Sequence, residues 1–212
     1  MKVLVVTEVK EGNLRKPSLE ILSKATHFNE AQVSALLMGH QVSSLVDKLA
    51  QYGAARVFVA DNPLLAQYQT EAYTHVVDKV VKELQPDLVL FVASVNGKDL
   101  APRVAARLDV GLASDVIELN YENGHFTALR PIFAGRIRAK VSVQSTPALV
   151  SIRPNMVAVN SPDESRKAEV SSVDFSLAES DFRVKVVDFI KPEGGKQDVA
   201  EADIIVTGGR GL

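Results

Sequence analysis

The chain contains no cysteine and no tryptophan, and it has no long hydrophobic run. Without cysteine it can form neither a disulfide framework nor a thiolate metal site. Its apolar runs stay well short of the roughly 18 residues that a membrane-spanning helix needs. The apolar start at residues 3–6 is also too short for a signal sequence. We therefore see no targeting segment and expect a cytoplasmic protein of bacterial type.

Neither sign of charge is in excess. The 24 Lys and Arg residues and the 26 Asp and Glu residues give a net charge of −2. Because nucleic-acid-binding domains are usually basic, this balance argues against a nucleic-acid partner. With 212 residues, 46% of them hydrophobic, the chain can form one large globular domain or one domain and part of another.

The first half of the chain, to about Leu112, alternates short apolar runs with stretches of helical periodicity. The apolar runs are typical of strands buried on both faces and cover residues 3–7, 33–38, 56–60 and 88–93. Helices are expected from Pro17-Ser18, with Glu20 in the first turn, and around the apolar stripes at 42–49, 76–84 and 100–108. In the last helix, Pro102 is tolerable if the helix begins within one turn upstream. This alternation predicts an α/β fold with a mostly parallel, Rossmann-like sheet flanked by helices.

After Leu112 the period changes from 3.6 to 2, which indicates an antiparallel β portion in the second half. Asn123-Gly124 predicts a hairpin between strands at 116–121 and 126–129. Residues 137–143 alternate apolar with polar side chains, as a half-exposed strand does, and 148–152 form a further short strand. The polar stretch 160–172 is interpreted as a loop or linker.

A domain boundary is expected near residue 190. Residues 184–189 have strand character and are assigned to a first domain of residues 1–190, and Lys191-Pro192-Glu193-Gly194-Gly195 is the best linker in the chain. Beyond it an apolar run leads into Gly208-Gly209-Arg210-Gly211, whose glycines would let backbone N–H groups approach a ligand. No helix follows this expected buried strand. We therefore interpret residues 191–212 as the start of a second, truncated domain, and the chain as a fragment.

No arrangement of residues predicts catalysis or metal binding. The histidines have no metal-ligand spacing on a shared element; they are His27, His40, His75 and His125. Four aspartates stand near predicted strand and helix ends, where capping explains them: Asp87, Asp99, Asp109 and Asp115. No Gly-x-Gly-x-x-Gly or Walker-type motif is present. We expect no catalytic residue and no metal site.

Two segments have alternative interpretations. Residues 94–99 follow a predicted parallel strand at the sheet edge where α/β proteins bind ligands, although a capped helix start is the simpler explanation. Arg130, Arg136 and Arg138 could present guanidinium groups to a carboxylate, a phosphate or a partner chain. They could equally form the solvated face of an edge strand.

Several stretches together carry a family resemblance. The most specific are Asn96-Gly97-Lys98-Asp99-Leu100-Ala101-Pro102-Arg103-Val104-Ala105 and the terminal Gly208-Gly209-Arg210-Gly211-Leu212. The others are Lys2-Val3-Leu4-Val5, Pro17-Ser18-Leu19-Glu20, Ala113-Ser114-Asp115, Arg130-Pro131 with Ala134-Gly135, and Val150-Ser151-Ile152-Arg153-Pro154. Over essentially its whole length the chain resembles the alpha subunit of electron transfer flavoprotein.

The resemblance implies a subunit that carries electrons and is not itself an enzyme. Such subunits pair with a beta subunit, accept electrons from dehydrogenases such as the acyl-CoA dehydrogenases of fatty acid beta-oxidation, and pass them to a quinone reductase. The first domain would hold no nucleotide, and AMP would belong to the beta subunit. The second domain would carry FAD, mostly through residues beyond 212. In this chain the implied FAD contacts are Arg210 and its neighbours Gly208, Gly209 and Gly211.

Two other interpretations stay open at this point. A small nucleotide-binding module of the universal-stress type shares the early β-α alternation, but the antiparallel portion and the missing phosphate-binding glycines argue against it. The domain could also be a heterodimer scaffold that does no chemistry by itself.

Overall fold

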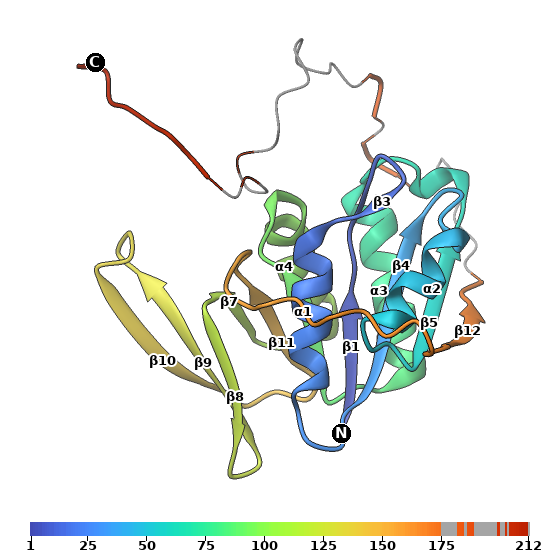
Figure 1. Cartoon of the computed structure of the whole chain (residues 1–212), viewed down its shortest axis with the longest axis horizontal. Coiled ribbons are helices and arrows are strands. Elements are labelled where there is room, and N and C mark those ends of the chain that lie inside the picture. The colour runs from blue at the N-terminus through green and yellow to red at the C-terminus, as the bar shows by residue number, and fades with distance from the viewer. Residues whose placement is uncertain (175–181, 185, 189–198, 200–201, 203, 212) are drawn as a thin grey trace.

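The continuous apolar runs of the first half form the centre of a seven-stranded parallel sheet, as the sequence predicts. The computed structural model describes residues 1–174, 182–184, 186–188, 199, 202 and 204–211. The strand order is β12-β5-β4-β1-β6-β11-β7, and each neighbouring pair is parallel (Figure 1). The strands are β1 (Lys2–Val6), β4 (Gln32–Gly39), β5 (Arg56–Asp61), β6 (Leu88–Val92), β7 (Leu112–Val116), β11 (Ala148–Ile152) and β12 (Glu169–Ser172).

Helices cover both faces of this sheet. The helices α1 (Lys16–Thr26) and α2 (Val46–Gln51) pack on one face, where Ile21 and Leu49 join a core with the side chains of alternate strand residues such as Val5. The helices α3 (Thr70–Leu84) and α4 (Val95–Leu108) pack on the other face, where Val80 and Val104 meet Leu4. Because residues next to each other on a strand point to opposite faces, two cores form from the same apolar runs.

Each of the four helices differs in some detail from its expected form. The second is short: a 3₁₀ turn, η1 (Ser43–Leu45), precedes α2. Another 3₁₀ turn, η2 (Pro63–Leu65), precedes α3. Pro102 lies in the interior of α4, not in its first turn, because the helix begins seven residues earlier at Val95. Glu20 lies outside the first turn of α1, where the sequence analysis had placed it, and its side chain is buried.

The antiparallel portion is a three-stranded sheet of β8 (Glu118–Glu122), β9 (His125–Ile132) and β10 (Ile137–Val143), in the order β10-β9-β8. The hairpin at Asn123-Gly124 is confirmed: both residues have positive φ, 53° and 80°, as a two-residue turn between Glu122 and His125 requires. A small hairpin, β2 (Val9–Lys10) with β3 (Asn13–Leu14), follows β1.

Other expectations for the second half were wrong. The strand expected at 116–121 is two strands, because β7 ends at Val116 in the parallel sheet and β8 begins at Glu118 in the antiparallel one. The expected loop 160–172 contains β12, whose residues pair with β5 at the edge of the sheet. Residues 184 and 186–188 are not in a strand, and the rest of the strand expected at 184–189 lies outside the described residues, as does the expected linker 191–195.

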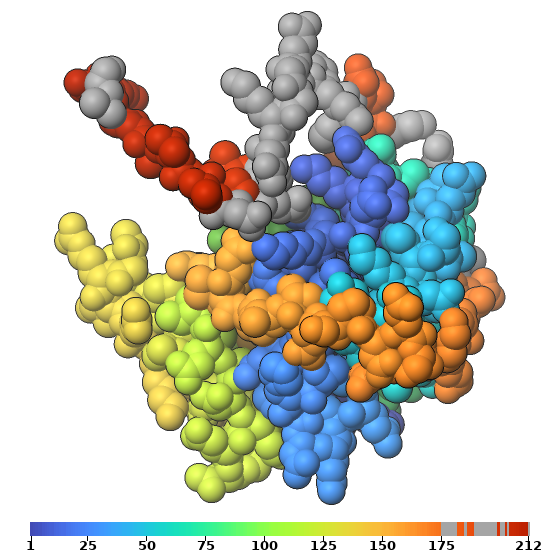
Figure 2. Space-filling model, in the orientation of Figure 1, coloured from blue at the N-terminus to red at the C-terminus, as the bar shows by residue number. Residues whose placement is uncertain are grey.

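Residues 153–168 form a strap that crosses α1 and joins β11 to β12 (Figure 1). Side chains on one face of α1 accept hydrogen bonds from the backbone of the strap. The Asn155 N–H donates to Glu20 Oε2 at 2.7 Å, and the Asn160 N–H donates to Ser23 Oγ at 3.0 Å. The Asn160 side chain adds a bond to Thr26. Figure 2 shows the strap as an orange band over the blue helix. The spacing of 20, 23 and 26 places the three partners along one face of the helix.

Candidate functional site

Three groups of polar side chains lie at the carboxyl ends of the parallel strands. Glu8 follows β1, Ser94 follows β6, and Arg153 follows β11. In open α/β sheets this edge is the usual place for a ligand or partner. The candidate site therefore has to be sought among the groups that meet here.

The first of these groups is the start of α4. Ser94 is its N-cap, and its hydroxyl accepts a hydrogen bond from the Gly97 N–H at 3.0 Å. The simpler interpretation of residues 94–99, a capped helix start, is thus confirmed. Gly97 is also required by space, because a Cβ there would lie 1.8 Å from the Val92 carbonyl oxygen. The helix can only begin this close to β6 with glycine at that position.

A carboxylate from another strand reaches the same helix start. The Ser94 hydroxyl donates to Glu8 Oε1 at 2.5 Å, and Arg15 Nη1 lies 3.0 Å from Glu8 Oε2. The backbone of Glu8 is fixed by α1, since its N–H donates to Ser18 Oγ at 2.8 Å. Sequence reasoning missed this contact, because Glu8 and Ser94 are 86 positions apart. The only local signal was a carboxylate directly after a buried strand.

A second polar group joins α3 and α4 through Asp99. The Tyr68 hydroxyl donates to Asp99 Oδ2 at 2.8 Å, and the Thr70 hydroxyl bonds to the same oxygen. The Thr70 hydrogen bond is the main cause that lowers the pKa of Asp99, against its partial burial. Burial, and then the nearby carboxylate, raise the pKa of Tyr68. This group holds the starts of two helices together.

The third group is centred on Asp115, which lies in a β-bulge of β7. Leu149 and Val150 of β11 pair with Leu112 and Ala113, but Ile152 pairs with Val116, so β7 contains one extra residue. Asp115 takes up the bulge with a positive φ of 57°, and its N–H donates to Ser151 Oγ at 3.0 Å.

The bulge directs the Asp115 carboxylate toward cations. Arg153 donates two hydrogen bonds to it, at 3.1 and 2.5 Å, and Lys98 Nζ lies 3.7 Å away. The Arg153 hydrogen bond is the main cause that lowers the pKa of Asp115. Beside it, Arg130 Nη2 donates to Ser114 Oγ at 3.0 Å. Four of the stretches that carry the family resemblance therefore meet at one place.

The four aspartates assigned to capping have mostly other roles. Only Asp109 ends a helix, as the left-handed C-cap of α4. Asp87 accepts the backbone N–H of Lys2 from the neighbouring strand at 2.7 Å, while Asp99 and Asp115 bond to side chains as described above. Sequence position alone did not distinguish these cases, because each aspartate does stand near an element end.

The three arginines of 130–138 do not converge on one point. Arg130 is half-buried on β9 and bonds to Ser114, whereas Arg136 is exposed in the turn and Arg138 is exposed on β10. The strand β10 forms the edge of its sheet, which agrees with the interpretation of charged residues on a solvated edge strand for Arg138.

The glycine-rich segment lies away from these groups. Residues 204–211 are exposed and form no strand; in Figure 1 they run outward from the domain. The buried strand expected at 204–206 is therefore not present: Val206 is 95% exposed. No strand of the described residues pairs with this segment, so its apolar side chains are exposed to solvent. A Cβ built at Gly209 or Gly211 would have no atom within 4 Å.

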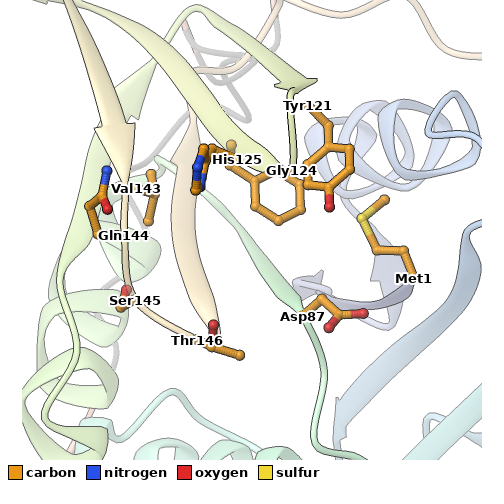
Figure 3. Close-up of a pocket in the computed structure, with 10 residues that line it drawn as sticks. Met1, Asp87, Tyr121, Gly124, His125, Val143, Gln144, Ser145 and Thr146 are labelled. Atoms are coloured by element: carbon orange, nitrogen blue, oxygen red, sulfur yellow. The ribbon is translucent and has the colours of Figure 1, made fainter.

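A hollow of about 320 Å³ lies at the opposite, amino edge of the sheet. Met1, Asp87, Tyr121 and His125 are among the residues that line it (Figure 3). The carboxylate of Asp87 is engaged by the N–H of Lys2, and the hollow is far from the polar groups of the carboxyl edge. The position of this hollow therefore does not support it as the functional site of the protein.

The described residues contain neither a metal-binding cluster nor a membrane-spanning helix. In this part of the chain no group of three or more His, Cys, Asp or Glu side chains is placed to hold a metal ion. Likewise, none of the helices described is both long and apolar enough to cross a bilayer.

Comparison with known proteins gives a consistent family. A model described as the electron transfer flavoprotein domain matches residues 3–178. The chain is 35% identical over its whole length to the electron transfer flavoprotein subunit alpha of Bacillus subtilis (strain 168), and it is 38% identical over 99% of its length to Protein FixB of Clostridium saccharobutylicum. It is also 32% identical, over 99% of its length, to the lactate dehydrogenase (NAD(+),ferredoxin) subunit LctC of Acetobacterium woodii. The chain spans 65%, 64% and 51% of these three relatives, respectively.

Proposed function

The chain belongs to the electron transfer flavoprotein family, with relatives among its alpha subunits, and from this we propose that it works as part of an FAD-containing electron carrier. In this role it pairs with a beta subunit, receives electrons from a dehydrogenase and passes them to a quinone reductase. The observation that carries the proposal is the family match over residues 3–178, which covers the described strands and helices from Val3 onward. The same match decides against a universal-stress-type module.

The electron donor is proposed to be an acyl-CoA dehydrogenase or another dehydrogenase of small organic acids. One relative is named as an electron transfer subunit of acryloyl-CoA reductase, from Anaerotignum propionicum, and another as a subunit of lactate dehydrogenase. These names associate two relatives of the chain with two different oxidoreductases, which supports a redox-enzyme partner for this chain as well. The domain itself would act as a scaffold and would supply no catalytic residue.

FAD does not fit the described residues as a complete site. A dinucleotide needs a pocket that encloses most of its surface, and residues 204–211 offer an exposed turn with one charged side chain. We propose that residues 191–212 belong to the FAD-binding unit and that residues 1–190 form a separate domain. Arg210 would then contribute one contact, with Gly208, Gly209 and Gly211 allowing the backbone close to the cofactor. AMP would bind only in the beta subunit.

When bound, FAD supplies the electron-carrying chemistry, and the positive charge of Arg210 would favour the anionic flavin. The remaining residues of this chain have a positioning role. The Arg130–Ser114 contact beside Asp115 joins the two sheets, the Arg153–Asp115 pair joins β11 to β7, and the start of α4 joins β1 to β6, so the carboxyl edge would offer a fixed surface against which a second domain and a partner subunit can be placed.

Co-expression tests the proposal. The full-length gene product, expressed with a beta-like partner, is expected to co-purify with it and to show a flavin absorption spectrum. If the product shows a flavin spectrum but no partner co-purifies, the protein would be a free-standing flavoprotein, and the heterodimer would be contradicted. If a partner co-purifies but no flavin spectrum is seen, only the scaffold role would be supported. If neither is found, the proposal would be wrong.

A further inference from the structure

The loops after β1 and β6 leave the sheet in opposite directions. From β1 the chain continues to its neighbour β4, whereas from β6 it continues through α4 to β7 at the far edge. The loops therefore diverge between the carboxyl ends of these two adjacent strands, and we call this position the crevice. In doubly wound sheets this crevice is where a ligand phosphate is held against a helix N-terminus.

In this protein a carboxylate of the chain itself fills the crevice. Glu8 Oε1 accepts the Ser94 hydroxyl at 2.5 Å, and it lies 3.3 Å from a Cβ built at Gly97, in the first turn of α4. Because Ser94 Oγ also accepts the Gly97 N–H, the hydroxyl connects the helix start to the carboxylate. The negative charge thus lies at the positive end of the helix dipole.

A partly buried arginine completes the surroundings of this carboxylate. Arg15 Nη1 lies 3.0 Å from Glu8 Oε2, and only 14% of each of the two side chains is exposed. The Arg15 N–H donates to the Glu8 carbonyl oxygen at 3.0 Å, and Ser18, fully buried, holds the Glu8 N–H. Backbone and side chain of Glu8 are therefore both fixed. A hydroxyl donor, a guanidinium and a helix N-terminus are the groups that bind phosphate oxygens in proteins.

We infer that Glu8 is the resident anion of this crevice and that its carboxylate closes the domain to phosphate-bearing ligands. A phosphate in the crevice would meet a fixed negative charge a few ångströms away and would find the hydroxyl and the guanidinium already engaged. The fold therefore keeps a phosphate-binding arrangement while its own side chain occupies it. This inference concerns residues 1–174 and does not depend on the role proposed for Arg210.

The test is to remove the carboxylate and offer inorganic phosphate. In Glu8→Ala the 212-residue chain is expected to gain a phosphate-dependent rise in Tm, measured at constant ionic strength against chloride. At a phosphate concentration ten times the dissociation constant, the unfolding constant should fall about elevenfold. Glu8→Ser, which can still hydrogen-bond to Ser94, should respond in the same way and serves if the alanine variant does not fold.

Three controls separate this effect from a general change in charge. Glu83→Ala removes a charge from the exposed side of α3 and should leave the protein insensitive to phosphate. Glu8→Gln removes the charge but keeps a side chain of the same size in the crevice, so it should respond to phosphate less than Glu8→Ala does. The double variant Glu8→Ala/Arg15→Ala should lose the response of the single variant. The inference is overturned if wild-type protein is stabilised by phosphate, or if folded Glu8→Ala and Glu8→Ser are not.

Discussion

The guanidinium of Arg153 and the carboxylate of Asp115 join the ends of two neighbouring parallel strands, with N–O distances of 3.1 and 2.5 Å. The pair forms because the bulge in β7 gives Asp115 a left-handed backbone, with φ at 57°, and so turns its side chain toward β11. This ion pair therefore holds together the stretches Ala113-Ser114-Asp115 and Val150-Ser151-Ile152-Arg153-Pro154.

Breaking this pair should destabilise the domain in a pH-dependent way. The lowered pKa of Asp115 means that the ionised form is favoured in the folded state. Its contribution is therefore present above the usual aspartate pKa of 3.8 and is lost as the pH falls through the lower, folded-state pKa. We expect Asp115→Asn to lower the free energy of unfolding by about 1 kcal/mol at pH 7, and to differ less from wild type at low pH. Asparagine tolerates the left-handed backbone.

Urea denaturation at pH 7 and at low pH measures this difference. Asp47→Asn is a matched control, because Asp47 and Lys167 form an ion pair that is mostly exposed. Its effect should stay within about 0.5 kcal/mol. Equal losses in the free energy of unfolding for the two variants would show that the Arg153–Asp115 pair stabilises the domain no more than an exposed ion pair does.

Glu20→Gln should stabilise the protein at neutral pH. Burial raises the pKa of Glu20, although the Asn155 N–H and Lys16 oppose this, so the folded state favours the protonated acid. For a raised carboxyl pKa, stability falls as the pH rises from the usual value of 4.5 through the folded-state value. Glutamine removes this loss and can still accept the Asn155 N–H. We expect a gain of about 0.5–1.5 kcal/mol at pH 7, which disappears below the usual glutamate pKa.

Thermal unfolding of both proteins between acidic and neutral pH gives the comparison. Glu20→Ala controls for the hydrogen bond, since it leaves the Asn155 N–H without its side-chain acceptor and should be destabilising at both pH values. A Glu20→Gln variant that is less stable than wild type at pH 7 would show that the charge of Glu20 is favourable in the folded state.

Gly97→Ala should be one of the most destabilising small substitutions. Alanine normally favours a helix by about 1 kcal/mol over glycine. Here, however, the new methyl group would lie 1.8 Å from the Val92 carbonyl oxygen, so α4 or β6 must move. We expect a loss of about 2–4 kcal/mol, measured by denaturant unfolding. Gly111→Ala is the control, because nothing lies within 4 Å of its Cβ position and its change should be small.

Arg210→Ala in the full-length heterodimer should weaken FAD retention and lower the flavin potential. The positive charge next to the flavin would be lost, and with it the preference for the anionic form. Arg138→Ala, which removes an exposed arginine from the edge strand β10, is the comparison variant. Should retention and potential stay at wild-type values while subunit association weakens, Arg210 would be an interface residue.

The 212-residue chain alone is expected to bind neither FAD nor AMP tightly. One arginine and three glycines in an exposed segment do not enclose a dinucleotide. Isothermal titration of the isolated chain with each ligand measures this. A submicromolar dissociation constant for FAD would show that the described residues suffice for the site.

The elements that sequence reasoning found are those with strong local signals. The strand at 88–93 was predicted from an apolar run and the turn at 123–124 from the Asn-Gly pair, and both are present. The strand β12 was missed because its residues, Glu-Val-Ser-Ser, form a short and mostly exposed edge strand with no apolar run. The separation of β7 from β8 was missed because only Ile117 lies between them.

The polar contacts of the carboxyl edge could not be predicted from local patterns. The capping role of Ser94 was foreseen, because Ser94 and Gly97 are three residues apart on one helix start. The contact of Ser94 with Glu8 depends on which strands become neighbours in the sheet, and that order is set by the packing of both cores. The partners of Asp115 come from β11 and α4 for the same reason.

The strap has a consequence for how the protein is made. It leads into β12, which covers the edge of β5, a strand whose central residues Val-Phe-Val-Ala are all buried. An uncovered apolar edge strand is a template for pairing with other chains. About 110 residues separate β5 from β12, so during synthesis the edge of β5 stays uncovered for on the order of ten seconds before β12 is made. Loosening the strap, for example at Asn160, should therefore show first as a lower yield of monomeric protein from cells, before any loss of cofactor or partner.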